Sequence, residues 1–220
     1  MISFTVDSEV FARGVSNALA FIPAGSRMPN VYFRLDPGRG VLEIVGTDSY
    51  AVGLATVPVT GTKGPTPVVE WLLTKGKADT KTAEGAAGVE RTVRMAGKGP
   101  CDVSLTAGRM EAAPMGGDVI SVLTITQADQ FPPYRHLVEM LGEADKRPGV
   151  IPGVIMWDWS LASRFAKVKA DKATGRMGDL LFGEGPLDPV LVKIGTEFRG
   201  LIMPIDREVN AENIGSDGLW

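Results

Sequence analysis

The stretch that decides the fold is VLEIVGTDSYAVGLA at residues 41–55. Apolar residues alternate with polar or small ones on both sides of the polar tetrapeptide GTDS at residues 46–49. This alternation is typical of two half-buried antiparallel strands. Thr47 and Asp48 suit the turn between them because their side chains can bond to nearby backbone groups. The sequence therefore predicts a β-hairpin here.

The residues before the hairpin predict a strand, a helix and a second strand. Residues 2–6 and 31–35 are the strand candidates, and residues 7–21 form the helix candidate, with Asp7 or Ser8 as its N-cap. The apolar stripe of this helix contains Phe11, Val15, Leu19 and Ile22, and its polar face contains Arg13 and Asn17. The stripe is what an ordinary amphipathic helix packed on a sheet requires, so any function belongs to the polar face.

The next segment predicts a helix followed by three strands. Residues 58–67 are rich in turn formers and separate this segment from the hairpin. A short helix is predicted over residues 68–74, and strands over residues 89–95, 102–106 and 119–126. Two successive units with a helix and several strands follow from this pattern.

The last third of the chain repeats the same order. The pattern predicts a strand over residues 154–157 and a helix over residues 158–172, with Asp158 as its N-cap. Further strands are predicted over residues 180–182, 190–194 and 199–205. Between the second and third units, residues 134–141 predict a short helix and residues 142–153 a loop.

Composition sets the limits for the class of protein. The 220 residues are 44% hydrophobic, enough for one large or two small cores. The first residues lack a charged start and a long apolar run, so we expect no signal peptide and a cytoplasmic location. The net charge of −3 argues against a protein that coats nucleic acid. Residues 206–220 carry all of it, so residues 1–205 are neutral and can still segregate basic charge onto one face.

The sequence predicts no enzyme, no cofactor and no metal site. Cys101 is the only cysteine and His136 the only histidine, which argues against a cysteine-built metal site and against a catalytic triad. No glycine-rich phosphate loop of the required spacing is present. We expect His136 to be a surface residue of the short helix.

The strand order and three short motifs resemble the sliding clamps of bacterial DNA polymerases. The motifs are GTD at residues 46–48, QADQFPPYR at residues 127–135, similar to the family's interdomain segment, and GLIMPI at residues 200–205, similar to its final strand. The resemblance implies an α+β fold of repeated strand-helix-strand-strand-strand units, with the sheets outside and the helices facing a DNA channel. It divides the chain into a clamp-type domain at residues 1–126, a linker with a short helix at 127–153, a reduced second domain at 154–205 and an acidic tail at 206–220.

The resemblance points to basic residues on the helices as contacts to DNA phosphates. Clamp helices line the central hole, where lysine and arginine hold the backbone without reading sequence. The expected DNA-facing residues are Arg27, Lys75, Lys77, Arg164, Lys167, Lys169, Lys172 and Arg176. For Arg27, and for the basic helix that follows Asp158, the alternative is an ordinary solvated charge.

The resemblance also implies an apolar pocket for short peptides of partner proteins near the final strand. Met203 and Pro204 are the residues that match the family's motif there. The tail beyond this strand, ending in Leu219 and Trp220, departs from the family, whose chains stop soon after it. The tail could be disordered, cover the pocket or anchor another protein.

The sequence thus predicts a processivity factor that encircles duplex DNA as a homo-oligomeric ring and tethers a polymerase, loaded by a clamp loader, with no membrane contact. The short length favours an origin in a phage or a mobile element. The alternative is a clamp-fold module that does not encircle DNA and acts through protein contacts. The reduced second domain and the apolar end of the tail favour this alternative, unless residues 134–153 hide a further unit.

Overall fold

A computed structural model describes residues 1–64, 67–77, 83–146, 158–171 and 178–205. The first unit agrees with the predicted order of strand, helix and three strands. Its elements are β1 (Ile2–Asp7), α1 (Ser8–Leu19), β2 (Asn30–Asp36), β3 (Val41–Thr47) and β4 (Ala51–Pro58), followed by the short β5 (Thr60–Lys63). β3 and β4 pair antiparallel from Val41 opposite Pro58 to Thr47 opposite Val52, so the predicted hairpin is confirmed. The expectation that its strands are half-buried is wrong, because both of their faces are covered by apolar clusters.

The second unit corrects two predictions. Its elements are β6 (Val69–Thr74), α2 (Gly85–Ala96), β7 (Pro100–Thr106), β8 (Arg109–Pro114) and β9 (Ile120–Leu123). The helix predicted over residues 68–74 is wrong, because this segment is strand β6. The strand predicted over residues 89–95 is also wrong, because these residues belong to helix α2. The pattern missed β8 altogether.

Both errors come from tertiary packing that overrides local sequence pattern. β6 pairs along β2 and is buried on both faces, since Leu72 packs under helix α3 and Leu73 under the helices of the opposite layer. A short run that is apolar throughout has no period that distinguishes strand from helix. In α2, the buried Ala86, Val89 and Val93 follow helical spacing, and packing outweighs the strand preference of valine.

The remaining elements begin with two helices that lead from β9 to the C-terminal part of the chain. They are η1 (Ala128–Gln130), α3 (Pro132–Ala144), α4 (Trp159–Phe165), β10 (Asp179–Leu181), β11 (Val190–Ile194) and β12 (Phe198–Ile202). The predicted cap of α4 is confirmed, because a carboxylate oxygen of Asp158 accepts from the Ser160 N–H at 2.7 Å. The helix ends at Phe165, earlier than predicted. The strand predicted over residues 154–157 lies outside the described residues.

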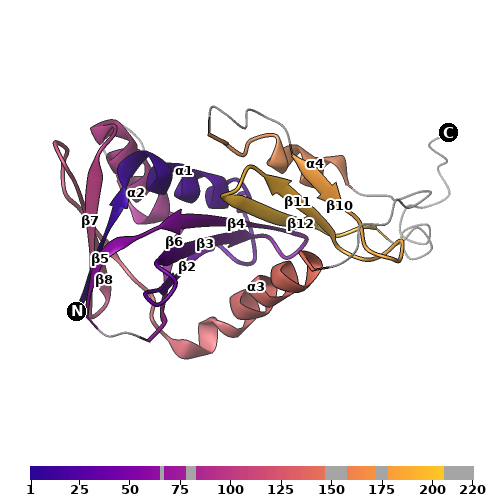
Figure 1. Ribbon diagram of the computed structural model, residues 1–220, viewed down its shortest axis with the longest axis horizontal. Helices are drawn as coiled ribbons and strands as arrows, with labels where there is room; N and C mark the ends of the chain where they lie inside the picture. The colour runs from indigo at the N-terminus through magenta and orange to yellow at the C-terminus, as the bar shows by residue number, and fades with distance from the viewer. Residues whose placement is uncertain (65–66, 78–82, 147–157, 172–177, 206–220) are drawn as a thin grey trace.

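The strands form two antiparallel sheets. The first has the order β5-β1-β7-β8-β9, and the second has the order β10-β11-β12-β4-β3-β2-β6. β1 and β6 each leave their own unit and join the sheet of the other, which ties the first two units into one body. The first sheet stands at one end of the elongated molecule and β10–β12 at the other (Figure 1).

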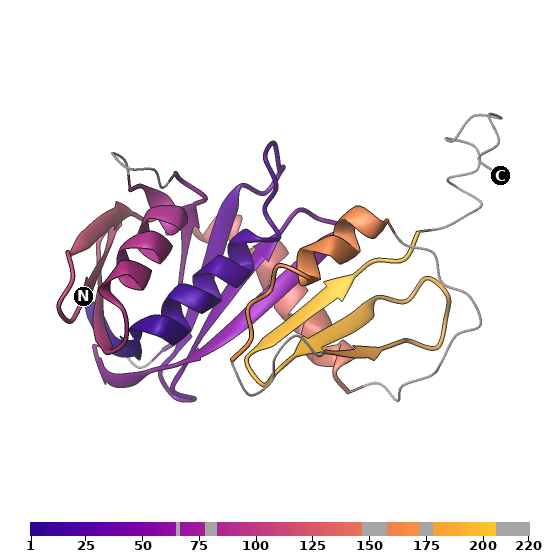
Figure 2. The same cartoon turned by 90° about the horizontal axis from the view of Figure 1, so that it is seen from above.

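Helices α2, α1 and α4 lie in a row on one face of the molecule, and α3 lies on the other face of the second sheet (Figures 1 and 2). The core between the sheets and α1 and α2 contains large buried side chains such as Phe4, Phe11, Phe33 and Trp71. A separate apolar cluster fills the space between the second sheet and α3. The junction with the C-terminal strands has its own cluster, in which Phe21, Phe165 and Phe198 meet.

Candidate functional site

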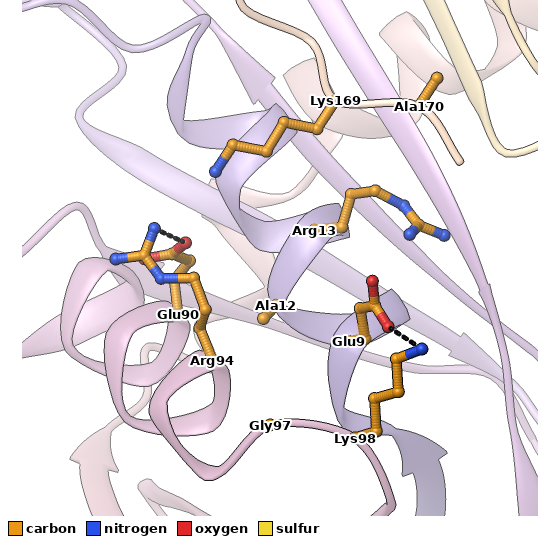
Figure 3. A pocket seen from close by; sticks show the side chains of 9 residues that line it. All are labelled: Glu9, Ala12, Arg13, Glu90, Arg94, Gly97, Lys98, Lys169 and Ala170. Atoms are coloured by element: carbon orange, nitrogen blue, oxygen red, sulfur yellow. Dashed lines mark ion pairs between the residues drawn. The ribbon is translucent and has the colours of Figure 1, made fainter. Parts of the chain in front are cut away.

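The row of helices presents the first candidate surface. Asp7 caps α1, since its carboxylate accepts from the Val10 N–H at 3.0 Å. The apolar side of α1 is buried, and the start of its polar side carries Glu9 and Arg13. A cavity of about 530 Å³ opens between α1 and α2 (Figure 3). It is lined by Glu9, Ala12, Arg13, Glu90, Arg94, Gly97, Lys98, Lys169 and Ala170.

Four of the lining side chains are basic, and three of them pair with carboxylates. Arg94 pairs with Glu90 at 3.3 Å and Lys98 with Glu9 at 3.8 Å, as Figure 3 shows. Arg13 pairs with Glu197 at 2.6 Å. The Lys169 ammonium instead donates to the Ser16 hydroxyl at 3.0 Å. The basic side chains that line this cavity therefore outnumber the acidic ones, and ion pairs neutralise part of their positive charge.

The segment after α4 is held on α1 by backbone contacts. The Asn17 side-chain amide donates to the Lys169 carbonyl at 3.0 Å and accepts from the Lys169 N–H at 2.9 Å. Both bonds are made by the backbone of Lys169. Its side chain is therefore left to extend along α1, where the ammonium group reaches Ser16. Lys167 is exposed in the same segment.

The structure separates the predicted DNA-facing residues. Lys169 lies at the cavity, whereas only 13% of the Arg164 side chain is exposed because it forms an ion pair with Asp48 of the β3–β4 turn. Lys75 is half-buried and its ammonium donates to the Ile22 carbonyl. Arg27 and Lys77 are exposed in loops. Lys172 and Arg176 lie outside the described residues.

Sequence reasoning missed Arg94 and Lys98 and gave Arg13 no role beyond the polar face. The signal was present, because Glu90 and Arg94 stand four residues apart, the spacing of an ion pair on a helix. The incorrect prediction of a strand over residues 89–95 hid this helical spacing.

Met203 lines a second, smaller cavity of about 150 Å³. Its walls come from the β3–β4 turn, from α3 and from the segment around β12: Thr47, Ser49, Tyr50, Ala51, Val52, Leu137, Met140, Leu201 and Met203. The Met203 N–H donates to the Tyr50 carbonyl at 3.3 Å, which holds the segment after β12 against the turn. Pro204 is half-buried next to Met203. Leu219 and Trp220 lie outside the described residues.

The β3–β4 turn itself is fixed by its polar residues. The Thr47 hydroxyl donates to the Ala51 carbonyl at 2.9 Å, and one carboxylate oxygen of Asp48 accepts from the N–H groups of Tyr50 and Ala51, each at 3.0 Å. The other oxygen of Asp48 pairs with Arg164. Tyr50 is left 63% exposed at the mouth of the cavity. The predicted role of Thr47 and Asp48 in the turn is confirmed.

Within the described ranges, no group of three or more His, Cys, Asp or Glu side chains could hold a metal ion. Cys101 is buried, and burial raises the pKa of its thiol to about 11. His136 is exposed on α3. Among the helices that the structure describes, none is long and apolar enough to cross a membrane.

The paired sheets with a row of helices along one face define the sliding-clamp fold, and solved structures of bacterial sliding clamps share it. The DNA polymerase III β subunit of Thermotoga maritima superposes with a TM-score of 0.61 at 13% identity, covering 99% of this chain and 68% of that one. The Helicobacter pylori β clamp bound to a DNA ligase peptide gives 0.67 at 11% identity, covering 93% and 65%. The Caulobacter crescentus sliding clamp gives 0.60 at 17% identity, covering 93% and 65%.

The predicted α+β sliding-clamp fold is therefore confirmed. The chain spans about two thirds of the length of these solved clamps. No protein-family model and no curated protein matches it.

Proposed function

We propose that this protein is a sliding clamp, a processivity factor that forms a homo-oligomeric ring around duplex DNA and tethers a DNA polymerase. The row of α2, α1 and α4 on one face is the observation that carries the proposal, because it gathers Arg13, Arg94, Lys98 and Lys169 around one cavity (Figure 3). The protein would act as a scaffold rather than an enzyme.

The ion-paired basic side chains at this cavity suit phosphate contacts that form and break as DNA moves past them. The side chains of Arg94 and Lys98 are 58% and 83% exposed, and exposed ion pairs are worth no more than about 1 kcal/mol. A passing phosphate can therefore replace the carboxylate partner at little cost. Such contacts depend on the charge of the backbone and not on base sequence.

The cavity at Met203 supplies the attachment for a polymerase, and a clamp loader would use the same surface. Its walls include the apolar side chains of Leu137, Met140, Leu201 and Met203, with Tyr50 exposed at one side. A volume of about 150 Å³ accommodates one or two apolar side chains of an extended peptide. The Helicobacter pylori relative was solved with a DNA ligase peptide, which supports peptide binding by this fold.

A second candidate is a clamp-fold module that does not encircle DNA. Three of the four basic side chains at the helical cavity have carboxylate partners, which reduces the attraction for phosphate. In this case the Met203 cavity alone would carry the function.

A charge reversal on the helical face tests the DNA contact. In the variant Arg94→Glu/Lys98→Glu we expect DNA binding at low salt to weaken by about tenfold or more, and the slope of affinity against salt to become shallower. Affinity measured by fluorescence anisotropy over a range of salt concentrations checks both. The control is Lys146→Glu, since Lys146 is exposed and follows α3 on the opposite face. Equal loss in both variants would contradict a DNA-facing helical surface.

Retention on closed circular DNA separates the two candidate functions. After loading onto a nicked plasmid, a ring stays bound in high salt and slides off once the plasmid is cut to a linear form. A module that does not encircle DNA shows the same retention on both forms. The peptide cavity is tested separately by Met140→Glu, which we expect to abolish binding of the polymerase while leaving retention on DNA unchanged.

A further inference from the structure

The β3–β4 turn holds a backbone conformation that needs support from its surroundings. Ser49 has a φ of 82°, and in the part of the chain that the structure describes it is the one residue other than glycine with a positive φ. A residue with a Cβ atom adopts this conformation at a steric cost, so other contacts must hold it in place. Thr47 does so from within the turn, because its hydroxyl accepts from the Ser49 N–H at 3.0 Å and donates to the Ala51 carbonyl.

Asp48 is the second residue that fixes the turn, and its two carboxylate oxygens have different partners. One oxygen accepts from the N–H groups of Tyr50 and Ala51, and the other forms the ion pair with Arg164 of α4. The side chains of Asp48 and Arg164 are only 9% and 13% exposed, so water does little to stabilise either charge. Among the described residues, Arg164 is the only cation that pairs with this carboxylate.

The turn lies between α4 and the Met203 cavity. On one side, Ala51 packs in the apolar cluster that includes Leu161 of α4. On the other side, Val52 packs in the cluster that includes α3. The turn and the first residues of β4 supply five of the nine residues that line the cavity: Thr47, Ser49, Tyr50, Ala51 and Val52. A shift of the turn would therefore change the shape of the cavity directly.

We infer that Arg164 is a positioning residue of the Met203 cavity. Its guanidinium holds the Asp48 carboxylate, and that carboxylate holds the backbone of the turn. The turn in turn holds the last segment of the cavity wall, since the Tyr50 carbonyl accepts from the Met203 N–H at 3.3 Å. The inference rests on the proposed function of this cavity as the place where a peptide of the polymerase attaches.

Removal of the Arg164 guanidinium should disturb the turn through the charge that it leaves behind. A poorly hydrated carboxylate without a counterion either moves toward water or takes up a proton. Both changes weaken the hydrogen bonds that Asp48 accepts from Tyr50 and Ala51. The turn is then released from the conformation at Ser49, and the cavity loses the wall against which an extended peptide packs.

The first test of this inference requires no partner. In protein with isotope-labelled methionine methyl groups, the NMR signals of Met140 and Met203, which line the cavity, should shift in Arg164→Gln. In Arg164→Lys they should stay close to their original positions, because one guanidinium nitrogen makes the ion pair and an ammonium group supplies the same charge. The control is Glu197→Gln, which removes the ion pair with Arg13 between the same two parts of the chain. Unchanged signals in Arg164→Gln, or equal shifts in Glu197→Gln, would overturn the inference.

The second test measures peptide affinity by fluorescence anisotropy. The probe is a peptide selected from a random library because it binds the unaltered protein and not Met140→Glu, which blocks the cavity. Arg164→Gln should weaken its binding by about tenfold, whereas Glu197→Gln should leave it unchanged. Asp48→Asn should weaken binding to a similar degree. The double variant Asp48→Asn/Arg164→Gln should bind no worse than either single variant, because both residues act through one contact.

The two tests separate a failure of the inference from a failure of the proposed function. If no such peptide can be selected while Arg164→Gln still shifts the methyl signals, the proposed attachment fails and the positioning of the wall stands. If the selected peptide binds Arg164→Gln as tightly as the unaltered protein, the inference fails and the proposed attachment stands. Additive losses in the double variant would also contradict the inference, since they would show that Arg164 does not act through Asp48.

Discussion

Gly46 shows how a single residue sets the distance between a helix and a sheet. A Cβ atom added at Gly46 would lie 1.9 Å from the carbonyl oxygen of Ala18, the penultimate residue of α1. The end of α1 thus rests directly on the backbone of β3. This contact places α1, and with it the polar face that carries Arg13, against the hairpin on which the fold is built.

Gly46→Ala should destabilise the protein by about 2 kcal/mol or more, because the backbone of α1 must move to accept the methyl group. Chemical unfolding measures the change in the free energy of unfolding. Gly142→Ala is the matched control, since Gly142 lies in α3, has a helical backbone and would meet no atom within 4 Å. There the same substitution should stabilise by up to about 1 kcal/mol. A loss at Gly142 as large as at Gly46 would contradict this reasoning.

At the scale of elements, α3 is held on the second sheet by stacking and by an ion pair. The rings of Tyr32 and Tyr134 stack with centroids 5.1 Å apart, and the Arg135 Nε donates to a carboxylate oxygen of Glu70 at 2.9 Å. The Tyr32 hydroxyl donates to the same carboxylate. The Arg135 guanidinium, helped by the Tyr32 hydroxyl, lowers the pKa of Glu70, and burial beside that carboxylate raises the pKa of Tyr32.

These contacts predict a pH-dependent part of the stability. Because the pKa of Glu70 is lower in the folded protein than in the unfolded chain, its ionisation stabilises the fold at neutral pH. This contribution is lost as the pH falls through the folded pKa, below the ordinary carboxyl value of about 4.5. Glu70→Gln should therefore be less stable than the unaltered protein at pH 7, and the difference should shrink in acid. Unfolding free energies measured across pH check this.

The control for this prediction is Glu139→Gln, which removes an exposed carboxylate from α3, the helix that Glu70 holds through Arg135. It should leave the free energy of unfolding at pH 7 nearly unchanged. A difference between Glu70→Gln and the unaltered protein that stays constant down to pH 3 would contradict the assignment of the effect to the ionised carboxylate.

At the scale of the whole molecule, the junction between β4 and β12 joins the first unit and the C-terminal strands into one sheet. The pair runs from Phe198 opposite Ala55 to Ile202 opposite Ala51. Phe198 is 2% exposed and stacks on Phe21, with ring centroids 5.7 Å apart. The ion pair of Arg164 with Asp48 holds α4 over the same junction. We therefore expect β10–β12 to unfold together with the first two units of the chain.

Phe198→Ala should lower the free energy of unfolding by about 3–5 kcal/mol, since it empties a large buried site at this junction. The comparison variant is Leu180→Ala, at a half-exposed position of the same sheet, which should cost about 0.5 kcal/mol or less. In a background in which the other three tryptophans, Trp157, Trp159 and Trp220, are replaced by Phe, fluorescence of the buried Trp71, in the strand at the far end of the sheet, should report the same transition as circular dichroism. Separate transitions from the two probes would show that the C-terminal strands fold independently.

The sequence by itself determined the elements whose local pattern is strong. Helix α1 has a cap at Asp7 and a clear apolar stripe, and the β3–β4 hairpin has apolar runs on both sides of a turn that Thr47 and Asp48 hold through their own side chains. These features depend on neighbours in the chain, so they can be read without the fold. The same holds for α3 and for the cap of α4, whereas the final strand predicted over residues 199–205 ends at Ile202, before Met203.

The tertiary structure alone decided the features that depend on distant partners. β6 is a strand because β2 lies beside it, and α2 is a helix because its Val89 and Val93 pack into the common core. The ion pair of Arg164 could not be predicted, because its partner Asp48 lies more than a hundred residues away in the chain. Arg94 and Lys98 meet Arg13 only because two repeated units pack their helices side by side. Lys169 joins them because Asn17 binds the backbone of the segment after α4. Local pattern carries no information on such contacts, since burial and pairing between distant segments override local preference.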